Sequence, residues 1–379
     1  MSKELINIRK TLHRFPELSG NETSTAERIA KELNSFQPDN LITGLGGTGV
    51  LAAFNAKESR AKKTILFRAE LDAIAVTEES EIGHQSQNRG IMHGCGHDGH
   101  MAIILGLGRY LHQNPPKNLN VLLLFQPAEE TGEGAALVME DSRFSKLKID
   151  QAFALHNLPG YEKNKIFIKK GTFACASTGV EITIKGRFSH AAYPEQGLNP
   201  ALCVADLIQN AEKTLNRFRE MDPLNKTVPT FIRMGEPAYG ISPGEAKMGY
   251  TLRSATDEGL KKGLQLLEET IEASAKQFKG TIKKRRIEPF AATLNSDEGV
   301  KIIQKAAAST NTPLEIMDRP FPWSEDFGEF RKQFPITIFG LGAGKNHPHL
   351  HFEKYDFNDD LIPAGVKIFS EIVESYSAL

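Results

Sequence analysis

The chain is organised around one glycine-rich stretch, Met92-His93-Gly94-Cys95-Gly96-His97-Asp98-Gly99-His100. Its glycines allow three histidines, a cysteine and an aspartate to converge on one point without backbone clashes. Thiolate and imidazole together suit a borderline-soft divalent metal ion such as zinc, cobalt or manganese. The alternative is a histidine-rich surface turn before a helix. Because Cys95 and His97 are too few ligands for a tetrahedral site, a metal site needs ligands from elsewhere in the chain.

Four apolar runs predict buried strands of an α/β sheet, and polar residues follow each of them. The runs and their polar residues are 64–67 with Glu70 and Asp72, 121–125 with Glu129 and Glu130, 151–155 with His156, and 336–339 with His347, His349 and His351. The largely apolar segment 97–113 predicts a buried helix. Ligands of open α/β sheets bind outside the carboxyl ends of the strands, so we expect these polar residues to share one site.

The composition predicts two domains and excludes several classes of function. The 379 residues exceed the roughly 100–200 residues of one domain. With 46 Lys and Arg against 47 Asp and Glu, the net charge of -1 gives no field that would gather nucleic acid or an anionic membrane. The sequence offers neither an apolar run of about 20 residues nor a signal-peptide core. Three cysteines form no disulfide framework, so we expect a reduced, cytoplasmic protein in which Cys95 can act as a thiolate.

Two further patterns bear on the architecture. Gly44-Leu45-Gly46-Gly47-Thr48-Gly49 matches the dinucleotide-binding pattern G-x-G-x-x-G, but a strand-like run, 50–54, follows it where a helix is required. We interpret it as a flexible turn and keep an NAD-dependent oxidoreductase as a minor alternative. Residues 172–290 predict the element order β-α-β-β-α-β of a ferredoxin-like domain. This domain would interrupt a larger α/β domain made of residues 1–171 and 291–379.

The adjacent carboxylates Glu129 and Glu130 form the second informative site. They follow an apolar strand through the turn Gln126-Pro127, where two carboxylates can serve one metal centre from different sides. One would bind the metal and the other would hold the attacking water. A solvated acidic turn is the alternative.

Several motifs in this order closely resemble a known family. They are Leu12 to Ser19, His93 to His100, Phe125 to Glu130, Ser324 to Phe327, and Leu350-His351 before Tyr355-Asp356-Phe357. The family is that of metal-dependent N-acyl-amino-acid amidohydrolases. It includes hippurate hydrolase, bacterial aminoacylases, N-acetyldiaminopimelate deacetylase, plant hydrolases of indoleacetyl-amino acids and, more distantly, carboxypeptidase G. The resemblance spans nearly the whole chain.

The resemblance implies a metallopeptidase-like α/β/α catalytic domain, with the ferredoxin-like domain as a lid and dimerisation domain. It also implies two divalent ions, of zinc, manganese, cobalt or nickel. The implied ligands are Cys95, His97, Glu130, His156 and His351. Two such ions can share a water, lower its pKa and polarise the amide carbonyl. Glu129 is implied to be the general base and acid.

Further residues are assigned by the same resemblance. His190, in the motif 186–192, would reach an active site, often that of the partner subunit, and donate to the oxyanion. Arg253 would bind the substrate carboxylate through a bidentate pair. Each could instead be an ordinary surface residue of a strand. Glu70, Asp72 and Asp98 would orient the ligand histidines by hydrogen bonds.

The chain departs from the family pattern at a few positions. Gly240 stands where many members have an asparagine, Arg187 replaces a smaller residue, and Glu353 replaces a proline. His347 and His349 lie close enough to compete with His351 as the ligand.

These observations predict a hydrolase of linear amide bonds that releases an N-acyl group from an amino acid. Its partner would be a small-molecule substrate, with neither nucleic acid nor membrane, and it would form a homodimer or a larger homo-oligomer. A metallo-dipeptidase, aminopeptidase or carboxypeptidase on the same scaffold is one alternative. A catalytically silent binder of small carboxylates is another.

Overall fold

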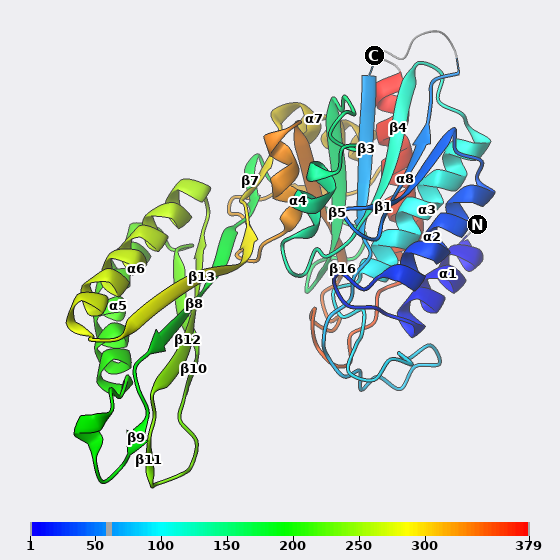
Figure 1. The fold of residues 1–379 in the computed structure, drawn as a ribbon. Coiled ribbons are helices and arrows are strands. Elements are labelled where there is room, and N and C mark those ends of the chain that lie inside the picture. The colour runs from blue at the N-terminus through cyan, green and yellow to red at the C-terminus, as the bar shows by residue number, and fades with distance from the viewer. Residues whose placement is uncertain (1, 58–62, 378–379) are drawn as a thin grey trace. The chain divides into compact units, whose positions relative to one another are not determined.

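The computed structural model describes residues 2–57 and 63–377, and the chain divides into two compact units (Figure 1). Unit 1 comprises Met1–Phe173, Thr293–Pro320 and Asp326–Leu379. Unit 2 comprises Ala174–Ala292 and Phe321–Glu325. Among the described residues, no helix combines the length and apolar character that crossing a bilayer requires.

Unit 1 is built on an eight-stranded mixed sheet with the strand order β1-β2-β4-β3-β5-β16-β6-β15. The strands are β1 (Asn40–Leu45), β2 (Gly49–Phe54), β3 (Lys63–Glu70), β4 (Leu119–Gln126), β5 (Gln151–Pro159), β6 (Ile166–Ile168), β15 (Leu314–Ile316) and β16 (Ile336–Gly344). The central strands β4, β3, β5 and β16 run parallel and are almost wholly buried. Strands buried on both faces are expected to be continuously apolar, which is why their runs were visible in the sequence.

Helices cover both faces of this sheet. One hydrophobic core joins it to α1 (Ser2–Arg14), α2 (Thr23–Ser35), α3 (His97–Gln113), α7 (Asp297–Ser309) and α8 (Leu361–Ser377). Phe67 of β3 belongs to that core, whereas its neighbour Arg68 bonds Asp326 of the 3-10 helix η2 (Asp326–Lys332). Successive strand residues point to opposite faces, so η2, with α4 (Gly134–Glu140) packed against it, covers the other face. The predicted α/β class is confirmed.

The glycine-rich segment 44–49 is the turn of a β-hairpin. Strands β1 and β2 pair antiparallel, with Leu45 opposite Gly49. A dinucleotide fingerprint requires a strand-to-helix turn at this place, so the structure removes the basis of the NAD-dependent alternative.

Unit 2 contains a four-stranded antiparallel sheet with the strand order β10-β12-β8-β13. Its elements are β8 (Ala176–Lys185), α5 (Ala201–Met221), β10 (Lys226–Met234), β12 (Glu245–Ser254), α6 (Asp257–Gln277) and β13 (Thr281–Phe290). They follow the order β-α-β-β-α-β of a ferredoxin-like sandwich. A second core joins both helices to this sheet. A short ribbon pairs β9 (Ser189–His190) with β11 (Ile241–Ser242).

Candidate metal centre

The nine-residue stretch forms the entry to α3. Gly96 precedes the helix at φ 91°, in the left-handed region that favours glycine. A Cβ atom on Gly96 would overlap the side chains of Asn157 and Tyr355. Because Gly96 tolerates both the conformation and the close approach, Cys95 and His97 flank the start of the helix and remain buried.

The structure brings all five implied metal ligands together. The ligand atoms of Cys95, His97 and His156 lie within 4.8 Å of one another, as do those of Cys95, Glu130 and His351. His97, Glu129 and Glu130 form a third such group. Since the groups share members, the donor set offers two adjacent positions for divalent ions.

The distances between nitrogen and carboxylate donors are too long for hydrogen bonds but close to those between two ligands of one metal ion. His97 Nε2 lies 3.8 Å from Glu129 Oε2 and 3.9 Å from Glu130 Oε1, and His351 Nε2 lies 3.7 Å from Glu130 Oε1. The Cys95 Sγ to His156 Nε2 distance is 3.5 Å. Two ligands about 2.0–2.3 Å from one tetrahedral ion lie roughly 3.3–3.8 Å apart.

The two buried ligand histidines both donate through Nδ1 and turn Nε2 toward this centre. Although burial lowers it, the charges of Cys95 and Glu70 raise the pKa of His97 well above its usual range, so a metal ion would displace a proton from His97 Nε2. His97 Nδ1 donates to the Asp72 carbonyl at 2.9 Å, and His156 Nδ1 donates to the Asn157 carbonyl at 2.8 Å. A neutral imidazole that donates through Nδ1 carries its lone pair on Nε2. His97 Nε2 is buried and has no hydrogen-bond partner within residues 2–57 and 63–377. Burial lowers the pKa of His156 to about 3, which keeps that ring neutral.

The charge balance of the centre also calls for a cation. Burial, and next the charge of Glu130, raise the pKa of the Cys95 thiol well above its usual range. A Cys95 thiolate beside two carboxylates therefore becomes favourable only when positive charge lies among them. The residues thus fit a pair of divalent metal ions.

Glu129 lies beside these donors, and a backbone N–H fixes its carboxylate. The residue is 5 % exposed, and its Oε1 accepts from the backbone N–H of Asp326 at 3.3 Å. Asp326 is itself fixed, because its carboxylate accepts from Arg68 at 2.5 Å and from Gln126 at 2.8 Å. Glu129 is therefore a buried carboxylate with a defined direction, which suits proton transfer.

The residues expected to orient the histidines have different partners. The backbone carbonyl of Asp72 accepts from His97, and its Oδ2 accepts from the Glu130 N–H at 2.9 Å. Glu70 Oε2 accepts from Nδ1 of His100, at 2.8 Å. His100 is not one of the five implied ligands.

The expectation for Asp98 needs correction. Its Oδ2 accepts from His13 Nδ1 at 2.8 Å and lies 3.4 Å from Arg9 Nη1. Both partners belong to α1, because Asp98 lies on the side of α3 that packs against α1. Asp98 therefore anchors the N-terminal helix rather than a ligand histidine.

Sequence reasoning missed Asn157, which ties the centre together. Its Nδ2 donates to the Cys95 carbonyl at 2.8 Å, and its Oδ1 accepts from the Tyr355 hydroxyl at 2.7 Å. Its backbone N–H also donates to His100 Nε2 at 3.1 Å. The position directly after His156 was the one available signal, since the partners of Asn157 are remote in sequence.

The structure distinguishes the three C-terminal histidines. His351 adopts φ 66°, and its N–H donates to the Gly94 carbonyl at 2.8 Å, which holds it beside Cys95 and Glu130. His347 Nε2 instead donates to the Asp356 carbonyl at 2.7 Å. His349 is exposed and contacts the ring of Phe352 edge-on.

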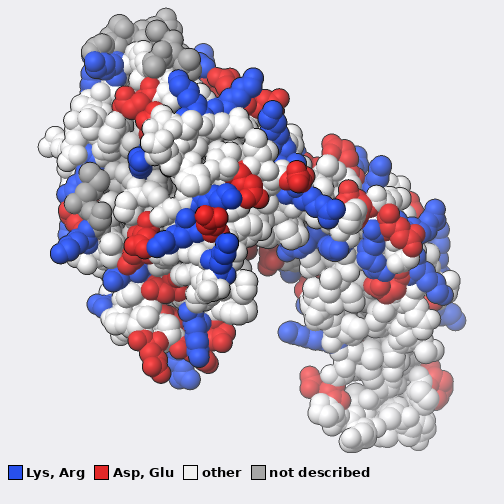
Figure 2. All heavy atoms as spheres, turned by 180° about the vertical axis from the view of Figure 1, so that it is seen from behind, with Lys and Arg blue, Asp and Glu red and all other residues white. Residues whose placement is uncertain are grey.

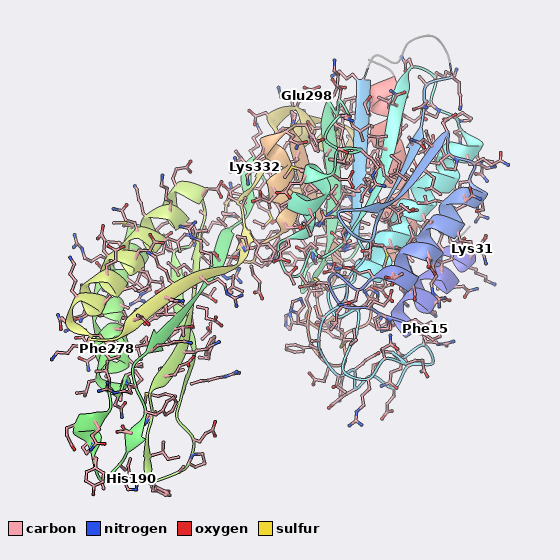
Figure 3. All side chains as sticks on the ribbon, in the orientation of Figure 1. Phe15, Lys31, His190, Phe278, Glu298 and Lys332 are labelled. Atoms are coloured by element: carbon pink, nitrogen blue, oxygen red, sulfur yellow. The ribbon has the colours of Figure 1, made fainter. Side chains whose placement is uncertain are left out.

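His190 and Arg253 belong to unit 2. His190 is exposed on the β9–β11 ribbon (Figure 3), and its Nδ1 accepts from the Ala192 N–H at 3.0 Å. Arg253 of β12 donates from Nη1 to Ser324 Oγ at 3.0 Å and to the Pro322 carbonyl at 3.3 Å.

Of the three departures from the family pattern, Arg187 has a structural role, whereas the contacts of Gly240 and Glu353 do not require these residue types. Arg187 Nε donates to the Gln196 carbonyl at 2.7 Å and thus closes the loop after the ribbon. A Cβ atom at Gly240 would meet nothing within 4 Å, so sterics do not require glycine there. The carbonyl of Glu353 accepts from the Glu79 N–H at 2.7 Å, a bond that needs no particular side chain.

Comparison with known proteins identifies the family of this chain. The profile of peptidase family M20/M25/M40 matches residues 66–375. The N-acetyldiaminopimelate deacetylase of Enterococcus faecalis is 31% identical and covers 98% of both chains. The hippurate hydrolase of Campylobacter jejuni is also 31% identical, over 98% of this chain and 96% of its own.

Solved structures share the fold. The YXEP protein of Bacillus subtilis, described as a dinuclear metal-binding peptidase of the M20 family, aligns with a TM-score of 0.80 at 23% identity, over 98% of this chain and 97% of its own. An aminohydrolase from methicillin-resistant Staphylococcus aureus gives the same TM-score at 22% identity, over 98% and 96% of the two chains. The chain therefore belongs to peptidase family M20/M25/M40 and is a hydrolase of that family.

Proposed function

We propose that this amide-bond hydrolase cleaves N-acyl amino acids and releases a carboxylic acid and the free amino acid. The observation that carries the proposal is the convergence of Cys95, His97, Glu130, His156 and His351 beside the buried carboxylate of Glu129. The relatives at 31% identity are named as a deacetylase of N-acetyldiaminopimelate and a hydrolase of hippurate. Both names denote hydrolysis at an acylated amino group, which supports this substrate class.

The five converging residues would hold two divalent ions, zinc, manganese, cobalt or nickel. When bound, such ions lower the pKa of a water and polarise the amide carbonyl. The shared position of Cys95 in two donor groups supports two ions rather than one.

Glu129 moves the protons of the reaction in this proposal. Its carboxylate accepts a proton as water adds to the amide carbon, and it returns that proton to the nitrogen as the C–N bond breaks. The Asp326 N–H holds Oε1, which leaves Oε2 on the side of His97, the direction of the centre.

Residues of unit 2 would complete the recognition of substrate. The exposed ring of His190 would donate to the oxyanion. Arg253 would bind the amino-acid carboxylate, since a guanidinium has five N–H donors and the bonds to Ser324 and Pro322 use Nη1.

The test of this function is amine release from N-acetyl, N-benzoyl and dipeptide substrates with added manganese, zinc or cobalt, against a chelated control. We expect metal-dependent release from N-acyl amino acids and none after chelation. Release from dipeptides alone would identify a metallo-dipeptidase on the same scaffold. Metal binding without cleavage of any substrate would favour the silent carboxylate binder.

We further propose that two copies of the chain associate through unit 2. We also propose a reducing, cytoplasmic location, which the three free cysteines support. β10 is an edge strand with Val228 and Ile232 half exposed. Ile241 of the β9–β11 ribbon and Tyr239 in the turn before it are also exposed. Figure 2 shows few charged side chains at this end of unit 2. An unpaired apolar edge can pair with its own copy about a two-fold axis.

Light scattering after gel filtration tests this association. The wild-type protein is expected at twice the mass of one chain, and Ile232→Lys is expected to shift it to the mass of one chain. The control is Ile316→Lys, an exposed isoleucine of unit 1. A monomeric wild type, or an unchanged Ile232→Lys, would contradict the proposed interface.

A further inference from the structure

The loop that carries Glu129 has a conformation that it cannot hold alone. Ala128, the residue directly before Glu129, adopts φ 50°, in the left-handed region that residues with a Cβ rarely occupy. Such a conformation persists only where the surrounding structure holds it. The direction of the Glu129 side chain follows from the orientation of this peptide.

A hydrogen bond to Glu22, at the start of α2, stabilises this conformation of Ala128. Glu22 Oε1 accepts from the Ala128 N–H at 2.8 Å, although the two residues are 106 positions apart. The Glu22 side chain is completely buried, so water does not compete for this bond. A hydrogen bond from an N–H to a carboxylate is shorter and stronger than one between neutral groups.

The Glu22 carboxylate is itself fixed by two other segments. Oε1 also accepts from the Gly20 N–H at 2.9 Å, and Oε2 accepts from the Thr48 hydroxyl at 2.8 Å. Thr48 lies in the glycine-rich turn between β1 and β2. This turn, which matches a nucleotide-binding pattern by its letters, therefore helps to fix the Glu22 carboxylate. One buried carboxylate thus joins the loop before α2, the hairpin turn and the loop of Glu129.

We infer that Glu22 is a positioning residue for Glu129: it holds the Ala128 peptide in its left-handed conformation and thereby aims the general base. The inference rests on the proposed role of Glu129. A displacement of about 1 Å in a catalytic group can lower the rate about 10²-fold. Loss of the hydrogen bond between Glu22 and Ala128 should therefore lower kcat. Glu22 touches none of the five implied metal ligands in the contacts that the structure gives it.

The first test compares Glu22→Leu with Glu22→Gln in the metal-loaded enzyme. Leucine removes both acceptors, and we expect kcat to fall by about 10²-fold with KM within about threefold. Glutamine can offer its carbonyl oxygen to Ala128 and Gly20 and donate from its amide to Thr48 Oγ, so Glu22→Gln should retain most of kcat. Metal content measured by atomic absorption should equal that of the wild type in both variants.

Glu17→Leu is the matched control. Its carboxylate accepts from Thr25 N at 2.7 Å and from Ser24 N at 3.2 Å, at the start of the same helix. This variant should lose thermal stability while kcat stays within about twofold. Equal losses of kcat in Glu17→Leu and Glu22→Leu would overturn the inference, because the effect would then be one of helix stability.

A double-mutant cycle with Glu129→Gln asks whether Glu22 acts through Glu129. In the Glu129→Gln background, Glu22→Leu should lower the remaining rate by less than about threefold. A loss as large as in the wild-type background would overturn the inference. If Glu129→Gln alone retains turnover, the proposed base fails; if it abolishes turnover while Glu22→Leu stays active, the inference about Glu22 alone fails.

Thr48→Val provides a milder variant in case Glu22→Leu does not fold. It removes the donor to Oε2, and we expect kcat to fall by about three- to tenfold, with Thr48→Ser restoring it. If Glu22→Leu does not fold, an unchanged kcat in Thr48→Val would overturn the inference, because a bond that fixes the Glu22 carboxylate would then have no effect on Glu129.

Discussion

Glu129→Gln is expected to lower kcat by about 10²–10⁴-fold, the range that a general acid–base group contributes. Glutamine has nearly the same shape and can still accept from the Asp326 N–H, so the loop should keep its structure. It cannot take up the proton of the attacking water, which is why the loss should fall on kcat. Amine release under saturating substrate measures it, and atomic absorption should find as much metal as in the wild type.

Two comparisons separate this role from others in the same loop. Glu133→Gln alters an exposed carboxylate of the loop and should stay within about twofold of wild-type kcat. Glu130→Gln alters an implied ligand and should lose bound metal together with activity. Near-normal turnover by Glu129→Gln would end its assignment as the base, whereas loss of metal would make it a ligand.

Arg9→Met is expected to lower the free energy of unfolding of the protein by about 3–5 kcal/mol, as measured when one partner of a buried ion pair is removed. Arg9 of α1 is fully buried, 2.5 Å from Asp356 and 2.9 Å from Asp359. Its Nη1 also lies 3.4 Å from the buried carboxylate of Asp98. Methionine fills similar volume but leaves these carboxylates without their common cation.

His13 supplies a second positive charge to the carboxylates around Arg9. Although burial lowers it, hydrogen bonds to Asp98 and Glu78 raise the pKa of His13 to about 9. The ring is therefore a cation at neutral pH and shares the neutralisation of Asp98 with Arg9. For this reason the loss in Arg9→Met should lie within the range for one missing partner and should not abolish folding.

Urea unfolding of the wild type, Arg9→Met and Lys10→Met measures this contribution. Lys10 follows Arg9 on the same helix and lies 3.7 Å from Asp359, but its side chain is 40 % exposed, whereas that of Arg9 is fully buried. Exposed ion pairs contribute little, so Lys10→Met should change the free energy of unfolding by less than about 1 kcal/mol. Equal effects of the two substitutions would show that the buried network does not stabilise the protein.

The sequence by itself determined the architecture and the type of chemistry. The central strands are covered on both faces, so their runs had to be continuously apolar and could be recognised without a structure. Polar residues at their carboxyl ends had to meet at one edge of the sheet, which is why the segments of Glu130, His156 and His351 were expected to share one site. The choice of these three residues as ligands came from the family resemblance.

Only the tertiary structure decided which buried polar groups serve the centre. Asp98 was expected to orient a ligand histidine, but the packing of α1 on α3 assigns it to His13 and Arg9. No sequence pattern predicted that Glu22 accepts a hydrogen bond from Ala128, 106 residues away. Likewise, none predicted the hydrogen bond between Asn157 and Tyr355. The physical reason is that apolar burial follows a local period along the chain, whereas the partner of a buried polar group depends on which distant segments packing brings within about 3 Å.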